Sequence, residues 1–91
     1  MTVTLNNRSW SHGVNVQIAK GPDHGGGPDD NYPREENRLN NEQSWTIAVP
    51  DGYDLWWRRD ANPDQPEIPP DYQSAWSHIV NFGDDVSRDI D

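Results

Sequence analysis

Apolar and polar residues alternate with a period of two along much of this chain, a pattern that predicts β-strands. The first run alternates Val3 and Leu5 with polar neighbours, and the second alternates Val14, Val16 and Ile18 with polar neighbours. The polar residues between the two runs are typical of a turn. We therefore expect the first two strands to pair with each other as a hairpin.

The middle of the chain predicts a second hairpin. Residues 44–49 and 53–58 each alternate in the same way, and the Pro-Asp-Gly sequence at 50–52 is a strong turn signal between them. A last strand is predicted near 75–82. No segment of useful length has the period of a helix, so the pattern predicts a mainly β protein.

About five to six strands joined by long Pro/Gly-rich loops predict a small antiparallel β-sandwich or partly closed barrel in one domain of 91 residues. Three consecutive glycines and nearby prolines predict a mobile loop at about 20–37. A Pro-rich loop is predicted at about 62–72. The acidic tail 83–91 is expected to fray, unless Val86 and Ile90 dock through a turn of helix.

The composition predicts a core built from a few large aromatic side chains, and it gives the chain a strong negative charge. Only 31% of the residues are hydrophobic, but five Trp, three Tyr and one Phe provide large apolar side chains. The net charge of −9 repels phosphate groups, so we expect neither nucleic acid nor an anionic membrane surface as a partner. Cationic proteins, metal ions and neutral sugars remain compatible with this charge.

The chain has no Cys, which excludes a disulfide framework and thiolate metal sites. This composition favours a reducing compartment such as the cytoplasm, without assigning one. We find no signal-peptide pattern after Met1 and no apolar run of transmembrane length.

One stretch resembles a known family. Residues 38–52 contain Leu-Asn-Asn-Glu-Gln-Ser-Trp-Thr-Ile followed by the Pro-Asp-Gly turn, with Asn-Arg at 7–8 before it and Trp-Trp-Arg at 56–58 after it. This order resembles the N-terminal β-hairpins of thaumatin-like proteins over about residues 2–60, and the resemblance implies β-sandwich topology. The chain lacks the cysteines of that family and has Glu42 where its turn has Gly, so no functional residue is carried over.

The adjacent pair Trp56 and Trp57 provides the most informative candidate site. Neighbours on a strand point to opposite faces, so both indoles cannot enter the same core. Parity places Trp57 inside and Trp56 on the other face, beside Asp54 and Arg58. An exposed indole between these charges predicts contact with a carbohydrate or a protein partner. The alternative is structural cover, by the Pro-rich loop or by Arg58 stacking on the ring.

Two further aromatic residues are candidates for the same contact with a partner. Trp10 is predicted at a loop tip between the first two strands, and Tyr53 begins the fourth strand. A loop-tip indole either docks back onto the domain or meets a partner. Together these side chains predict a non-catalytic binding module that recognises a carbohydrate or a protein surface. An alternative is an acidic interaction, assembly or inhibitor protein, whose aromatic face serves self-association as a homo-oligomer or a basic partner.

A calcium-stabilised β-domain is a third hypothesis. Asp60, Asn62 and Asp64 stand at alternate positions, and Asp71 follows where a twelfth-position ligand would lie, which is the spacing of a calcium loop. Gln65 replaces the turn Gly of an EF-hand, so only a looser oxygen-ligand calcium site is predicted. Turn-forming residues without a metal are the alternative.

The three histidines offer another candidate metal site. His12, His24 and His78 form a metal site with Asp23 or Asp29 only if the fold brings them together. The chain has no nucleophile elbow, phosphate loop or His-Glu metal motif, so we expect no enzyme activity.

Overall fold

A computed structural model describes residues 1–61, 70, 72 and 74–91 of the chain. These residues form strands without helices, and consequently no helix among them has the length and apolar character needed to cross a membrane. The strands are β1 (Thr2–Asn6), β2 (Val14–Gly21), β3 (Arg34–Leu39), β4 (Ser44–Ala48), β5 (Asp54–Arg59), β6 (Ser77–Ile79) and β7 (Val86–Asp89).

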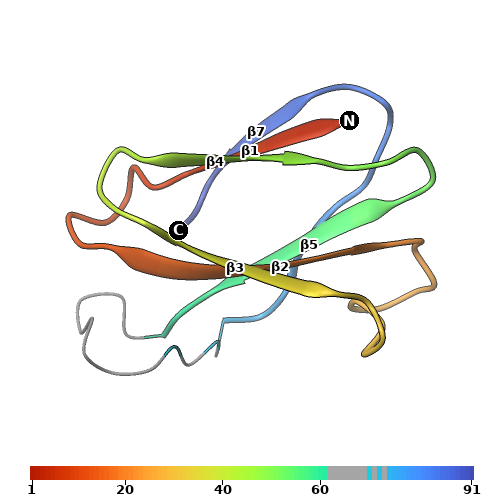
Figure 1. Ribbon diagram of the computed structural model, residues 1–91, viewed down its shortest axis with the longest axis horizontal. Helices are drawn as coiled ribbons and strands as arrows, with labels where there is room; N and C mark the ends of the chain where they lie inside the picture. The colour runs from red at the N-terminus through yellow and green to blue at the C-terminus, as the bar shows by residue number, and fades with distance from the viewer. Residues whose placement is uncertain (62–69, 71, 73) are drawn as a thin grey trace.

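The strands form two sheets that pack face to face, one with the order β4-β1-β7 and the other with the order β3-β2-β5-β6. In Figure 1 the first sheet lies above the second. Neighbouring strands run antiparallel except β1 and β7, which are parallel. The prediction of a mainly β, sandwich-like protein is therefore confirmed.

Both predicted hairpins are wrong, because the chain crosses between the sheets at each turn. β1 pairs with β4 and β7, whereas β2 pairs with β3 and β5. The first crossing is anchored by the buried side chain of Asn7, which donates hydrogen bonds to the carbonyls of His12 and Leu39, each at 3.0 Å. At the second crossing, Gly52 adopts a φ of 81°, which other residues rarely adopt. Alternation along a strand indicates its buried face and leaves its neighbours undetermined.

The predicted loop at about 20–37 is too long. β2 continues to Gly21 and an unpredicted strand, β3, begins at Arg34. β3 has the sequence Arg-Glu-Glu-Asn-Arg-Leu, in which only Leu39 is buried. It is an edge strand rich in charged residues, of which Glu35 and Glu36 are exposed, so it lacks the alternating apolar signal from which strands are predicted.

The C-terminal tail does not fray. Val86–Asp89 form β7 beside β1, and Ile90 is fully buried, with its N–H donating to the carbonyl of Asn6 at 2.8 Å. The last predicted strand, near 75–82, shortens to β6.

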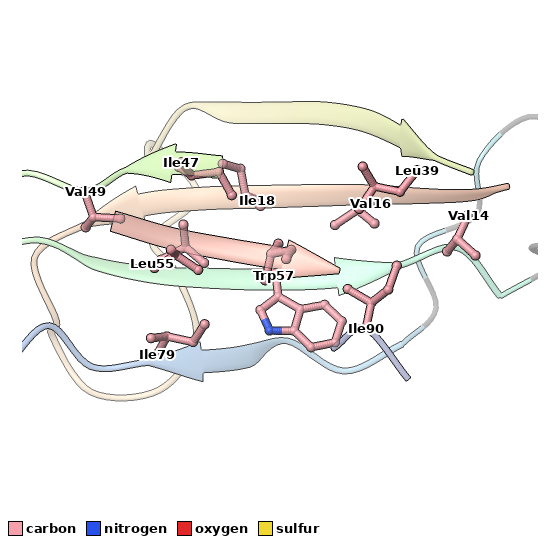
Figure 2. Close-up of a cluster of buried hydrophobic side chains, with 12 residues drawn as sticks. Val14, Val16, Ile18, Leu39, Ile47, Val49, Leu55, Trp57, Ile79 and Ile90 are labelled. Carbon is pink, nitrogen blue, oxygen red and sulfur yellow. The ribbon is translucent and has the colours of Figure 1, made fainter. Parts of the chain in front are cut away.

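The core lies between the two sheets, where apolar side chains from both meet in one cluster (Figure 2). Burial of each such side chain stabilises the folded state by about 1.5–3 kcal/mol. A domain of this size buries a modest fraction of its surface, so its stability depends on these side chains. The members are Val3, Leu5, Val14, Val16, Ile18, Leu39, Ile47, Val49, Leu55, Trp57, Ile79 and Ile90. Trp57 is thus inside, as the parity of β5 predicts.

Candidate functional site

Trp56 lies on the opposite face of β5 from Trp57, as predicted, but the expectation that its indole is exposed is wrong. The residue is only 1% exposed. Its ring stacks on the imidazole of His78 with centroids 4.6 Å apart and planes at 11°. On its other flank the ring of Tyr32 lies 6.0 Å away at a tilt of 38°. The outward indole is therefore covered, by residues that the sequence pattern did not single out for this role.

A glycine makes room for this cover. A Cβ atom at Gly21 would lie 2.4 Å from the ring of Tyr32, so only glycine lets that ring sit against β2. The Tyr32 hydroxyl donates to the carbonyl of Pro22 at 2.6 Å, which holds the ring in place. Burial raises the pKa of the Tyr32 hydroxyl, and the nearby Asp29 carboxylate raises it further.

Arg58, also predicted as a contact residue, is tied into the same outer layer. Its guanidinium donates to Oε1 of Gln17 from Nε at 2.9 Å and from Nη2 at 2.6 Å. It also lies over the ring of Trp76 at 4.2 Å and that of Tyr72 at 5.5 Å, and Arg34 lies over Trp76 at 5.3 Å. Burial lowers the pKa of Arg58, and the charge of Arg34 lowers it further. These interactions close the outer face of the β3-β2-β5-β6 sheet.

Several polar groups of this layer bond to one another, although the buried Nε1 of Trp56 has no hydrogen-bond partner among the described residues. Gln17 donates from Nε2 to Oε1 of Glu36 at 2.9 Å. Burial raises the pKa of Tyr72 to about 12, with further contributions from the charge of Glu36 and from a hydrogen bond to it. The face that we expected to recognise a ligand is thus largely occupied by the protein's own side chains.

Trp10 docks back onto the domain. Its side chain packs against the core, with the guanidinium of Arg59 4.9 Å from the ring centroid. Its backbone N–H donates to Oδ1 of Asn7 at 3.1 Å, and its carbonyl accepts from Nδ2 of Asn41 at 2.9 Å. The docking alternative for Trp10 is therefore the one observed.

A pocket of about 340 Å³ opens at one end of the sandwich, where β2 ends, β3 begins and the β4–β5 turn passes. Its walls combine two tyrosine rings, three prolines and two opposite charges. The lining residues are Lys20, Gly21, Pro22, Tyr32, Pro33, Glu35, Pro50 and Tyr53. Of the residues predicted for recognition, Tyr53 alone lines this pocket, and it is 40% exposed.

The two charged side chains of the pocket form a salt bridge. Nζ of Lys20 lies 3.6 Å from Oε2 of Glu35 and donates to the carbonyl of Ala48 at 3.2 Å. The pocket therefore offers apolar ring faces beside one fixed cation and one fixed anion, the usual make-up of a small-molecule or side-chain pocket.

Two exposed apolar side chains belong to the segment that follows β6. Phe82 is 85% exposed and Val80 is 42% exposed. Between them, Asn81 donates from Nδ2 to the carbonyl of Pro50 at 3.1 Å, which ties this segment to the pocket wall. Sequence reasoning missed Tyr32 and Phe82 as surface candidates, because Tyr32 lies in the connection before β3 and Phe82 was assigned to the last predicted strand, which ends at Ile79 in the structure.

Asp54 is not the exposed contact residue that we predicted. It is buried, and its Oδ2 lies 2.7 Å from Nε2 of His78 while its Oδ1 accepts from the N–H of Asn81 at 3.0 Å. Asp23 joins this pair, and one donor atom from each of Asp23, Asp54 and His78 lies within 4.8 Å of the others. Among the described residues, these three form a candidate metal-binding group.

This group overlaps the predicted histidine site in part. His78 and Asp23 are brought together, whereas His24 is not among the donors and lies edge-on to the ring of Tyr32 at 5.9 Å. His12 is exposed beyond β1, and Asp29 accepts from the N–H of Asn31 within its own turn. The third member of the group is the buried Asp54 of β5, and neither His12 nor His24 belongs to it.

The predicted calcium site stays a prediction. Asp60 is buried, where its Oδ2 accepts from Nδ2 of Asn15 at 3.0 Å. Asn62, Asp64 and Asp71 lie outside the described residues, as does most of the predicted Pro-rich loop.

Comparison with protein-family models, with curated proteins and with solved structures finds no match to this chain. The resemblance to thaumatin-like proteins stays a prediction.

Proposed function

We propose that this protein is a non-catalytic binding module that recognises a basic protein partner through its pocket end. The recognition surface consists of Tyr32, Tyr53, Val80 and Phe82, which we call the aromatic end surface. The observation that carries the proposal is an open pocket walled by two tyrosine rings, together with an 85% exposed Phe82 in the segment that Asn81 ties to Pro50 of the pocket wall. Contiguous exposed apolar side chains on a small domain are typical of an interaction site.

The chemistry of the aromatic end surface suits the core of a protein interface. Tyrosine and phenylalanine are enriched in such cores, because they bury a large area with few rotatable bonds. A pocket of about 340 Å³ accommodates one or two partner side chains. Phe82, outside the pocket, would pack against whatever surrounds them.

Charge favours a basic partner. The chain carries a net charge of −9, and exposed carboxylates flank the surface: Asp51 follows Pro50, and Asp84 and Asp85 follow Phe82 closely. A partner that inserts an apolar side chain between lysines or arginines would complement both features. Such complementarity accelerates encounter and weakens as salt rises.

A carbohydrate ligand is the second candidate. The rings of Tyr32 and Tyr53 together with Lys20 and Glu35 offer a stacking surface and hydrogen-bonding groups of the kind that sugars use. This candidate leaves the exposure of Phe82 without a role, so we rank it below a protein partner.

The test is a screen of the purified protein against two arrays in parallel. One array holds short peptides in which an aromatic residue or proline is flanked by Lys or Arg, and the other holds glycans. We expect peptide binders whose affinity falls with added salt. For the strongest peptide, Tyr53→Ser and Phe82→Ser should each weaken binding by about tenfold or more, as loss of an interface anchor does.

The matched control is Thr46→Ala, an exposed change on the other sheet that should leave the affinity unchanged. Binding to glycans alone would replace the protein partner with a sugar. Self-association in sedimentation that Phe82→Ser abolishes would identify a second copy of the chain as the partner. Peptide binding that neither Tyr53→Ser nor Phe82→Ser weakens would overturn the proposal.

A further inference from the structure

We propose that Asp23, Asp54 and His78 form a binding site for a divalent transition-metal ion of the zinc class. The three residues come from separate parts of the chain: Asp23 from the β2–β3 connection, Asp54 from the start of β5 and His78 from β6. One donor atom from each lies within 4.8 Å of the other two. This inference is independent of the proposed partner binding.

The donors are held from behind, as metal ligands usually are. The carboxylate of Asp54 accepts the N–H of Asn81 at 3.0 Å through one oxygen and faces His78 with the other. Oδ1 of Asp23 accepts the N–H of Gly25 at 3.0 Å, which fixes the direction of that side chain. The imidazole of His78 is held by stacking on Trp56.

The three donors must shift to receive an ion. Zinc holds nitrogen and oxygen ligands at about 2.0–2.2 Å, so donors that share one ion lie about 3.3–3.6 Å apart. Nε2 of His78 and Oδ2 of Asp54, now hydrogen-bonded at 2.7 Å, would separate to admit it, and the proton that they share would be released to solvent as the ion binds. Asp23 and His78 are exposed, so an ion from solvent can reach both donors.

The donor set selects the metal. Calcium and magnesium prefer sites built from oxygen, whereas an imidazole beside carboxylates suits zinc and its first-row neighbours. Three protein ligands also leave a coordination position open for water or for a donor group of another molecule. The site therefore differs in residues and in metal from the calcium loop that the sequence predicted.

An ion at this site would connect the β2–β3 connection to the β5–β6 edge of the sheet. Asp23 directly follows Pro22, which lines the pocket and accepts the hydroxyl of Tyr32. Metal binding would therefore hold one wall of the aromatic end surface against the sheet, and the folded state would be stabilised by mass action.

The experiment is calorimetric titration of Zn²⁺ alone into protein freed of metal with a chelator, together with thermal melts with and without Zn²⁺. Wild type should bind one ion and melt at a higher temperature when Zn²⁺ is present. Asp23→Asn and His78→Gln should each lower the affinity by more than the roughly 10- to 100-fold that loss of an orienting partner costs.

The controls are Asp84→Asn and His12→Gln, which make the same chemical changes at exposed positions outside the group and should bind Zn²⁺ like wild type. Asp23 is exposed, so Asp23→Asn tests the site even where a change at the buried Asp54 disturbs folding. Zn²⁺ binding that is absent in wild type, or that survives both Asp23→Asn and His78→Gln, would overturn the assignment. Because Zn²⁺ is the sole probe, neither result depends on whether the peptide screen succeeds.

Discussion

Glu42 is the residue whose backbone fits its side chain least. It is the one non-glycine residue of the described chain with a positive φ, at 66°. Its N–H donates to the carbonyl of Asn7 at 2.8 Å, so the turn before β4 is tied to the end of β1. The resemblance to thaumatin-like proteins places a glycine here, and the observed conformation is one that glycine adopts without the cost of a Cβ clash.

Glu42→Gly is therefore expected to stabilise the protein. Relief of the left-handed strain should exceed the added freedom of glycine in the unfolded chain, with a net gain of up to about 1 kcal/mol. Denaturant unfolding measures the change. Glu42→Ala removes the same carboxylate but keeps the strain, so it should not reproduce the gain. A Gly variant no more stable than the Ala variant would show that the turn is unstrained.

The sequence predicted correctly that the two adjacent indoles point to opposite faces of β5, but it did not predict what surrounds Trp56. The opposite directions of Trp56 and Trp57 follow from extended backbone alone, and both are observed. The cover over Trp56 depends on Tyr32, which lies 24 positions earlier in the chain and reaches the indole because Gly21 makes room for its ring. That proximity comes from strand pairing, which alternation does not encode.

At the level of elements, β7 closes the smaller sheet. It lies beside β1 in parallel and delivers Ile90 into the core. The expected fraying of this tail was wrong because its acidic side chains face solvent while its two apolar residues pack against the core. A short strand with few apolar positions gives little periodic signal even when its docking is strong.

Ile90→Ala is expected to lower the free energy of unfolding by about 2–5 kcal/mol, the usual cost of emptying a buried isoleucine site. Val80→Ala is the control: it also truncates an aliphatic side chain, but an exposed one, and should change stability by no more than about 0.5 kcal/mol. Chemical denaturation compares the two variants with wild type. Equal stability of Ile90→Ala and wild type would mean that the tail does not dock.

The strands themselves were predicted better than their partners. Five of the observed elements, β1, β2, β4, β5 and β6, overlap with predicted runs. In β1, β2 and β4 the apolar residues at alternate positions are buried or half-buried, whereas β6 has only Ile79 buried. β3 was missed because of its charged sequence. The hairpins were misassigned because crossings between sheets use the same turn residues as tight hairpins do.

Over the whole molecule, the outer face of the larger sheet is covered by the protein's own side chains, whereas the pocket end is open to solvent. The aromatic and arginine side chains over the β3-β2-β5-β6 sheet are occupied with one another, whereas Tyr53 and Phe82 at the pocket end face solvent. The hypothesis that an acidic protein recognises its partner through aromatic side chains stands as a proposal. We now place the recognition site at the aromatic end surface and not at Trp56. Of that surface, the sequence analysis had named only Tyr53 as a contact residue.

The most direct test of this location is NMR chemical-shift mapping with the strongest basic peptide from the array. The proposal predicts that the largest changes fall on Tyr32, Tyr53, Val80 and Phe82, while Thr46 on the opposite sheet stays unmoved. Changes centred on Thr46 and the rest of the β4-β1-β7 sheet, with the signals of Tyr53 and Phe82 unchanged, would contradict it.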